Sequence, residues 1–193
     1  MMGIENKQLT DAQLQSAFVT VSGNYIRNSD FDRGVFQEDL ILKTIVGADD
    51  KELTIGEARL VLVNGEQVDF GDVADSISGD VWIVASRMLN HFNLPSDNRF
   101  AIVDDFFVYG KNVTVKTRVK LFKEQVLPYL YGRGIDSVGF LNGSICYSNS
   151  ELEHENLDAL FEYELPIIRE TVKDESWKGW VNVIDLAEAE MLD

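Results

Sequence analysis

Residues 100–108 read FAIVDDFFV, an apolar run of strand length that Asp104 and Asp105 interrupt. A short polar loop, GKN at residues 110–112, follows this run. Apolar residues then recur every three or four positions, as on one face of a helix: Val115, Val119, Phe122, Val126 and Leu130. The next run, SVGFLN at residues 137–142, predicts a second strand. Strand, helix and strand in this order predict two parallel strands joined by a right-handed crossover.

The C-terminal part of the sequence extends the pattern. It predicts a helix from about residue 152 to 163, and apolar stretches at 167–172 and 180–184 predict two closing strands paired antiparallel. No internal repeat or Pro/Gly-rich linker divides the chain. The expected fold class is therefore α/β, with residues 1–193 forming a single-domain mixed sheet flanked by helices.

The N-terminal part gives weaker signals. Thr10-Asp11 predicts the start of a short helix through Phe18, and residues 35–46 are ambiguous between helix and strand. Asn64-Gly65 favours a type I′ turn, which predicts a hairpin between residues 58–63 and 66–70. An apolar stripe from Val73 to Met88 predicts a helix, which Asp72 or Asp75 would cap.

The charge of the chain limits its partners. With 17 basic and 33 acidic side chains the net charge is −16, which disfavours direct binding of nucleic acid or of an anionic membrane. Residues 101–134 are the exception, with six basic against three acidic side chains. One cysteine, Cys146, excludes an internal disulfide, and no apolar run reaches membrane-spanning length. These features predict a cytoplasmic protein with cationic ligands or basic partners.

Two stretches resemble the GNAT acyltransferases, which transfer an acyl group from coenzyme A to an amine. One is the strand, loop and helix of residues 100–130, and the other is NLDALFEY at residues 156–163. The latter is similar to the family's helix motif of Asn, Ala three residues on and Tyr seven residues on. The resemblance is clearest over residues 100–185 and implies an acyl-CoA N-acyltransferase-like fold with acetyl-CoA as the acyl donor.

The resemblance also implies a coenzyme site. In the family, the N–H groups of the loop and the helix N-terminus hold the pyrophosphate of the coenzyme. The positions that match this site are Phe106, Val108, Lys111, Asn112, Val113, Thr114, Val115, Lys116, Thr117, Asn142 and Asn156. The chain departs from the family in having no glycine in KNVTVK at residues 111–116, so either the lysines supply the charge or the coenzyme site is lost.

Catalytic roles follow from the same resemblance. Asp104 or Asp105 would remove the proton of the ammonium group, and Tyr163 would protonate the leaving thiolate. Adjacent strand residues face opposite sides of a sheet, so we expect at most one aspartate to face a given cleft. The alternatives are that a bulge or strand end hydrates both aspartates, that Thr114 and Thr117 cap the helix, that Asn142 lies in a turn and that Tyr163 is a boundary residue.

Two functions therefore remain open. The first is a GNAT-like N-acetyltransferase acting on a cationic acceptor, either a small amine or a basic protein. The alternative is an inactive, GNAT-like acidic binding protein that imitates the charge of nucleic acid or inhibits a basic partner. No metal ligand set is expected from two histidines and one cysteine, and a homodimer is compatible with either function.

Overall fold

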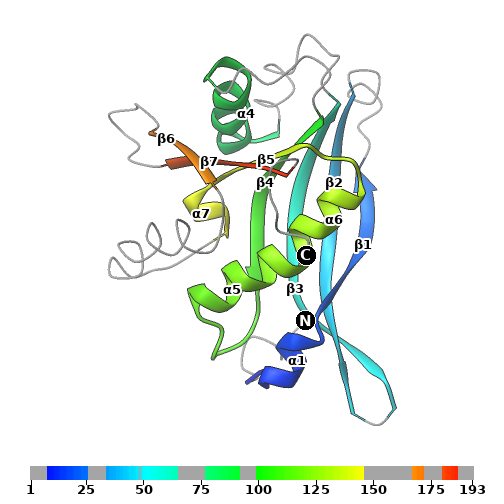
Figure 1. The fold of residues 1–193 in the computed structure, drawn as a ribbon. Coiled ribbons are helices and arrows are strands. Elements are labelled where there is room, and N and C mark those ends of the chain that lie inside the picture. Colours follow the sequence, from blue (N-terminus) through cyan, green and yellow to red (C-terminus); the bar gives the residue numbers. More distant parts are fainter. Residues whose placement is uncertain are drawn as a thin grey trace.

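The computed structural model describes residues 8–25, 34–47, 49–64, 77–91, 99–145, 167–171 and 180–186 (Figure 1). Its strands are β1 (Phe18–Tyr25), β2 (Val35–Val46), β3 (Lys51–Asn64), β4 (Arg99–Val108), β5 (Ser137–Leu141), β6 (Ile167–Thr171) and β7 (Trp180–Asp185). Its helical segments are α1 (Asp11–Gln15), α4 (Gly79–His91), α5 (Val115–Leu121), the π-helical turn η1 (Phe122–Val126), α6 (Leu127–Gly132) and α7 (Asn142–Ile145). None of these helices has the length and apolar character needed to cross a membrane.

The seven strands form one mixed sheet in the order β1-β2-β3-β4-β5-β7-β6. Only β4 and β5 pair in parallel, and all other neighbours are antiparallel. The α/β fold class and the parallel crossover from β4 through α5 and α6 to β5 are therefore confirmed. The closing strands are antiparallel as predicted, and β7 lies between β5 and β6.

Helices cover both faces of the sheet (Figure 1). Side chains alternate along β3, so Leu60 faces the α5–α6 side while Val61 faces α4. Both are fully buried, because β3 is a central strand with a hydrophobic core on each side. On the α5–α6 side, Phe122 makes edge-to-face contacts with Phe106 and Phe140, with ring centroids 5.6 and 5.7 Å apart.

The predicted helix after residue 115 is present, and its hydrogen-bond pattern changes from α to π and back to α along its length. The backbone N–H of Leu127 donates to the carbonyl of Phe122, five residues earlier, which defines the π turn η1. Pro128 follows directly and has no N–H to donate. The π turn thus changes the helical hydrogen-bond pattern at the point where a proline would interrupt it. Val119, Phe122, Val126 and Leu130 all remain buried, so the predicted apolar stripe is retained.

The predicted Asn64-Gly65 hairpin is wrong. Residues 58–63 lie in β3, where Leu62 pairs with Phe36 of β2 on one edge and with Ala101 of β4 on the other. Both edges of the strand are therefore occupied, and no edge remains for residues 66–70, which lie outside the described residues. The hairpin that exists joins β2 to β3, and its turn contains Asp50 with a φ of 49°.

Three other N-terminal elements differ from expectation in their bounds or type. Thr10 caps α1 as predicted, but the helix ends at Gln15 rather than Phe18. The ambiguous stretch at 35–46 is strand β2. Helix α4 begins at Gly79, and Ser78 Oγ caps it by accepting from the N–H of Val81 at 3.1 Å, whereas the predicted caps Asp72 and Asp75 lie outside the described residues.

Gly56 is the position where a side chain would disturb the sheet most directly. A Cβ there would stand against the carbonyl oxygen of Phe107 on the neighbouring strand, and a backbone atom cannot move aside as a flexible side chain can. We expect Gly56→Ala to lower the free energy of unfolding by about 1–3 kcal/mol. Gly132→Ala is the matched control, because beyond its chain neighbours and its own helix backbone no described atom lies within 4 Å of its added Cβ. Urea unfolding of the two variants tests this, and equal stabilities would contradict it.

Candidate active site

A β-bulge lies in β4 at the two aspartates. Arg59 of β3 pairs with Asp105, and the next pair is Leu60 with Val103, so Asp104 is the extra residue. The pairing of β4 with β5 ends at Val103 and Phe140, although β4 continues to Val108. The bulge therefore lies where β4 parts from its parallel neighbour. The structure thus confirms a bulge at the two aspartates, whereas their predicted role in proton transfer stays a prediction.

The bulge brings both carboxylates to the same arginine. Nη1 of Arg59 lies 3.4 Å from Oδ2 of Asp104 and 3.6 Å from Oδ2 of Asp105. The extra residue interrupts the alternation of the strand, so both carboxylates reach Arg59, while only Asp105 lines the pocket described next. Ser78 Oγ also donates to Oδ1 of Asp104 at 3.2 Å. Asp104 is thus held by two partners and only 12% exposed, whereas Asp105 is 37% exposed.

Asp105 lines a small pocket on the same face of the sheet as α4, opposite to the face that α5 and α6 cover. Its volume is about 110 Å³, and strands β1 to β4 supply its lining residues: Ser22, Asp39, Ile41, Glu57, Ala58, Arg59, Asp105 and Phe107. Asp39, Glu57 and Asp105 place three carboxylates against one guanidinium, so we call this the acidic pocket. Within the described residues no group of His, Cys, Asp and Glu side chains is arranged to hold a metal ion. The acidic pocket suits an organic cation.

The pKa of Asp105 is raised above its usual value. Burial is the largest cause, the charge of Asp104 adds to it, and Arg59 opposes it, while Asp80 and Glu57 raise it further. The pKa of Asp80, in the first turn of α4, is also raised, by burial and by Asp104. A carboxylate with a raised pKa is a better proton acceptor than a free aspartate.

The loop that matches the family's phosphate site is engaged within the chain. Asn112 Oδ1 accepts from the N–H of Leu9 at 2.9 Å, and its Nδ2 donates to the carbonyl of Leu9 at 2.7 Å. Thr114 caps α5, since its Oγ1 accepts from the N–H of Thr117 at 3.2 Å. Val113 and Val115 pack against the hydrophobic core. Asn112 thus fastens the N-terminal segment to the loop, and the capping role foreseen for Thr114 is present.

The two lysines of this region are exposed. Lys111 lies in the loop and Lys116 in the first turn of α5, and no carboxylate pairs with either among the described residues. Lys116 lines a groove of about 260 Å³ between α1 and α5. Thr114 and Thr117 lie on the same groove, with Asp11 and Glu124. The groove therefore combines cationic and hydroxyl groups with two carboxylates.

The remaining predicted coenzyme positions are distributed differently. The side chains of Phe106 and Val108 are buried, so only their backbone could meet a ligand at the edge of β4. Asn142 begins α7, which packs beside β4 and β5, and its Oδ1 accepts from Nδ2 of the buried Asn182 at 2.6 Å. Asn156, Tyr163 and Cys146 lie outside the described residues. The structure thus brings Asp104 and Asp105 together and separates them from the exposed lysines.

The partners of the two aspartates, Arg59 and Ser78, were not among the residues predicted from the sequence. Glu57 and Arg59 alternate with the buried Ala58 and Leu60, which is the pattern of a strand with one polar face. That alternation predicts that the side chain of Arg59 lies on the polar face of the strand. Its contact with Asp105 depends on the pairing of β3 with β4, which could not be predicted together with a hairpin at Asn64-Gly65.

Loss of the Asn112 amide should destabilise the chain without affecting the acidic pocket. Asn112→Ala removes two hydrogen bonds to Leu9, each with a net value of about 0.5–1.5 kcal/mol. We therefore expect the free energy of unfolding to fall by about 1–3 kcal/mol. Lys111→Ala, at the exposed neighbouring position, should leave it unchanged. Urea denaturation measures both, and an unchanged stability in Asn112→Ala would show that Leu9 does not depend on this contact.

No family model and no curated protein matches the sequence. Among solved structures, the chain is similar to one described as FeeM, an N-acyl amino acid synthase from uncultured soil microbes. The similarity covers 88% of this chain and 95% of that chain, with 10% sequence identity and a TM-score of 0.38. At this TM-score the likeness carries no conclusion about the activity of this chain.

Proposed function

We propose that the protein is an N-acyltransferase that moves an acyl group from a coenzyme A thioester to a cationic amine bound in the acidic pocket. The observation that carries this proposal is the β4 bulge, where Asp105 has a raised pKa and faces the pocket at the point where β4 leaves β5. A carboxylate in this position can hold an ammonium group and then accept its proton. Acetyl-CoA is the donor that the resemblance implies.

The reaction requires a free amine. An ammonium group bound by the acidic pocket transfers a proton to Asp105, and its nitrogen lone pair then attacks the thioester carbonyl carbon. The new C–N bond forms as the C–S bond breaks, and the acylated nitrogen releases its second proton to water to give the neutral amide. The thiolate takes a proton from water or from Tyr163, the residue that the resemblance assigns. Asp104 and Arg59 position Asp105 and set its charge environment, because Arg59 contacts both aspartates.

The coenzyme's phosphates would bind beside Lys111 and Lys116. Both lysines are exposed and unpaired within the described residues, and they lie in the segment of the chain that has a basic excess. If the site is functional, acetyl-CoA stabilises the fold by mass action, by about 2.7 kcal/mol at 100 times its dissociation constant. Replacing both lysines by glutamate should abolish that stabilisation.

One observation favours the second candidate, an acidic binding protein without catalysis. The loop has no glycine between residues 111 and 116, and the side chains of Asn112 and Thr114 are already bonded within the chain. An acidic protein that has lost its coenzyme site would still bind a basic partner through its surface charge. Binding of acetyl-CoA separates the two candidate functions, because only the N-acyltransferase requires it.

A paired binding experiment separates them. We expect acetyl-CoA to raise the melting temperature of the wild type, and spermidine to bind with an affinity that falls in Asp39→Asn/Glu57→Gln. Asp49→Asn/Asp50→Asn, which changes two exposed aspartates in the β2–β3 turn, is the control for the loss of two charges. Spermidine binding without any response to millimolar acetyl-CoA would favour the acidic binding protein. Unchanged spermidine affinity in the double variant would show that the acidic pocket does not bind the amine.

A further inference from the structure

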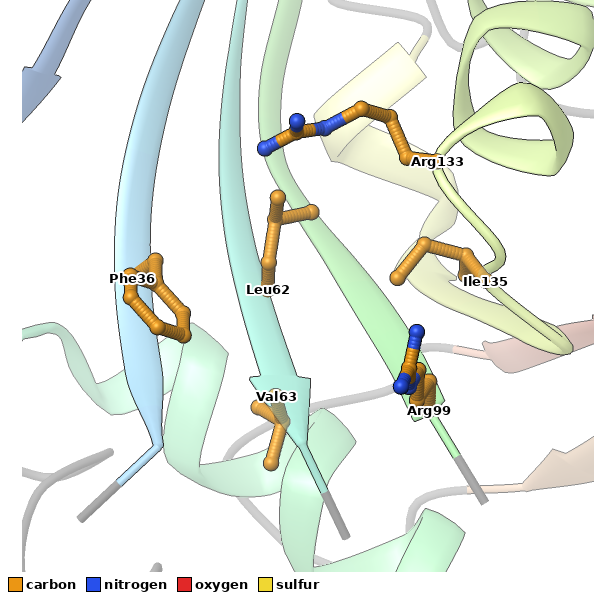
Figure 2. Close-up of a pocket in the computed structure, with 6 residues that line it drawn as sticks. All are labelled: Phe36, Leu62, Val63, Arg99, Arg133 and Ile135. Carbon is orange, nitrogen blue, oxygen red and sulfur yellow. The ribbon is translucent and has the colours of Figure 1, made fainter. Parts of the chain in front are cut away.

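A second pocket lies at the end of the sheet where β4 begins. Its volume is about 310 Å³, and Phe36, Leu62, Val63, Arg99, Arg133 and Ile135 line it. Figure 2 shows these six side chains, with four apolar groups from β2, β3 and the segment after α6, and two arginines. We call it the arginine pocket. Its volume lies at the lower end of the range for ligand sites, about 300–1,000 Å³.

The two arginines are held in different ways. Arg133 extends from the end of α6 toward β3 (Figure 2), and its Nη2 lies 3.3 Å from Oε2 of the buried Glu38. The other oxygen of Glu38 accepts from the hydroxyl of Tyr129, so this carboxylate is satisfied within the chain. Burial and the bond to Glu38 raise the pKa of Tyr129, which keeps the phenol protonated. The ion pair with Glu38 therefore positions Arg133, and half of the Arg133 side chain remains exposed.

Arg99 differs from Arg133 in its surroundings. Its side chain is exposed, and among the described residues no carboxylate pairs with its guanidinium. Asp136 lies nearby and accepts from the backbone N–H of Arg99 at 2.9 Å, but Asp136 does not line the pocket. Among the residues that the structure describes, the lining therefore holds two guanidinium groups and no acidic side chain, in a chain whose net charge is −16.

Apolar surface lies between the two positive groups. Figure 2 places Leu62 and Ile135 between the guanidinium groups of Arg133 and Arg99, with Phe36 beside them. Guanidinium groups bind carboxylate and phosphate oxygens through paired hydrogen bonds, and the aliphatic and aromatic lining favours a hydrocarbon chain. An oxyanion attached to a short apolar chain would satisfy both parts of the site.

We propose that the arginine pocket binds a small aliphatic oxyanion, a carboxylate or phosphate monoester whose chain covers Leu62 and Ile135. This site is independent of the proposed acyl transfer, because none of its lining residues lines the acidic pocket. It also has the opposite charge preference. Ligands that enter one pocket should be excluded from the other.

Octanoate and octyl phosphate are the probes, and isothermal titration calorimetry of the whole chain is the measurement. We expect at least one of them to bind, and at least about ten-fold more tightly than acetate or inorganic phosphate, because burial of the methylene groups adds favourable free energy. Octylammonium and octanol, which keep the chain and lack the oxyanion, should bind at least about ten-fold more weakly, because they lose the hydrogen bonds between the oxyanion and the guanidinium groups. Binding by octanoate identifies a carboxylate site, and binding by octyl phosphate alone identifies a phosphate site.

Arg99→Gln tests the residue that carries the proposal. Because Arg99 has no ion-pair partner among the described residues, the variant should keep its melting temperature while its affinity for the probe falls at least about ten-fold. Lys51→Gln, an exposed lysine at the start of β3, is the control for the change in net charge. Arg133 is left intact because its removal would leave the buried Glu38 unpaired.

Three results would overturn the proposal: no binding of either probe at millimolar concentration, equal binding of octylammonium, or unchanged affinity in Arg99→Gln. None of these results affects the acidic pocket. Conversely, failure of spermidine or acetyl-CoA to bind would leave the arginine pocket intact, so the two accounts fail separately.

Discussion

Replacing Asp105 by asparagine should slow amine acylation by about 10²–10⁴-fold, the usual loss when a positioned general base is removed. Asparagine has nearly the same shape and can still lie beside Arg59, but it cannot accept the proton of an ammonium group. The loss should fall on turnover, whereas acetyl-CoA affinity should be unchanged. Stopped or continuous detection of the released thiol, with acetyl-CoA and spermidine, measures the rate.

The stability of the same variant provides its control. The folded-state pKa of Asp105 is raised, so its protonated form is favoured in the folded chain, and the stability this gives is lost as the pH rises through that pKa. At neutral pH the ionised carboxylate opposes folding, and Asp105→Asn should melt no lower than the wild type. A variant that melts markedly lower would show that its lost activity reflects misfolding. Full activity in a folded variant would remove Asp105 from the mechanism.

Truncation of Phe122 to alanine should lower the free energy of unfolding by about 3–5 kcal/mol. Phe122 is fully buried, and its ring contacts Phe106 of β4 and Phe140 of β5 edge-to-face. The variant therefore removes the aromatic contact that holds the helix to the two parallel strands near their divergence. Urea unfolding measures the change.

The control for this truncation lies on the same helical run. Tyr131 of α6 is 51% exposed, and Tyr131→Ala should change the stability by about 0.5 kcal/mol or less. Similar losses in Tyr131→Ala and Phe122→Ala would contradict the assignment of Phe122 to the core between helix and sheet.

Patterns confined to neighbouring residues predicted the fold well. The stripe from Val115 to Leu130 and the runs at 100–108 and 137–142 predicted β4, the helix and β5, because burial on one helix face and in central strands leaves a periodic trace. The Asn64-Gly65 signal failed because tertiary pairing overrode it. β3 has β2 and β4 on its two edges, and a local turn preference cannot compete with two ladders of hydrogen bonds.

The candidate site was predictable in part. The interruption of an apolar strand by Asp104 and Asp105 indicated a polar feature there, and the structure gives it the form of a bulge. The acidic pocket was not predictable, because it requires strands β1 to β4 to bring Asp39 and Glu57 beside Asp105. Likewise, no local pattern in the sequence places Arg99 and Arg133 in one pocket. They line the same pocket because the chain returns after α6 to the start of β4.

Product formation by the whole chain from acetyl-CoA and a panel of cationic amines, followed by mass spectrometry and by thiol release, tests whether the protein is an N-acyltransferase. We predict one acetylated amine for each coenzyme A released by the wild type, with the rate about 10²–10⁴-fold lower in Asp105→Asn. Thiol release that does not exceed the protein-free rate with every amine in the panel would contradict it.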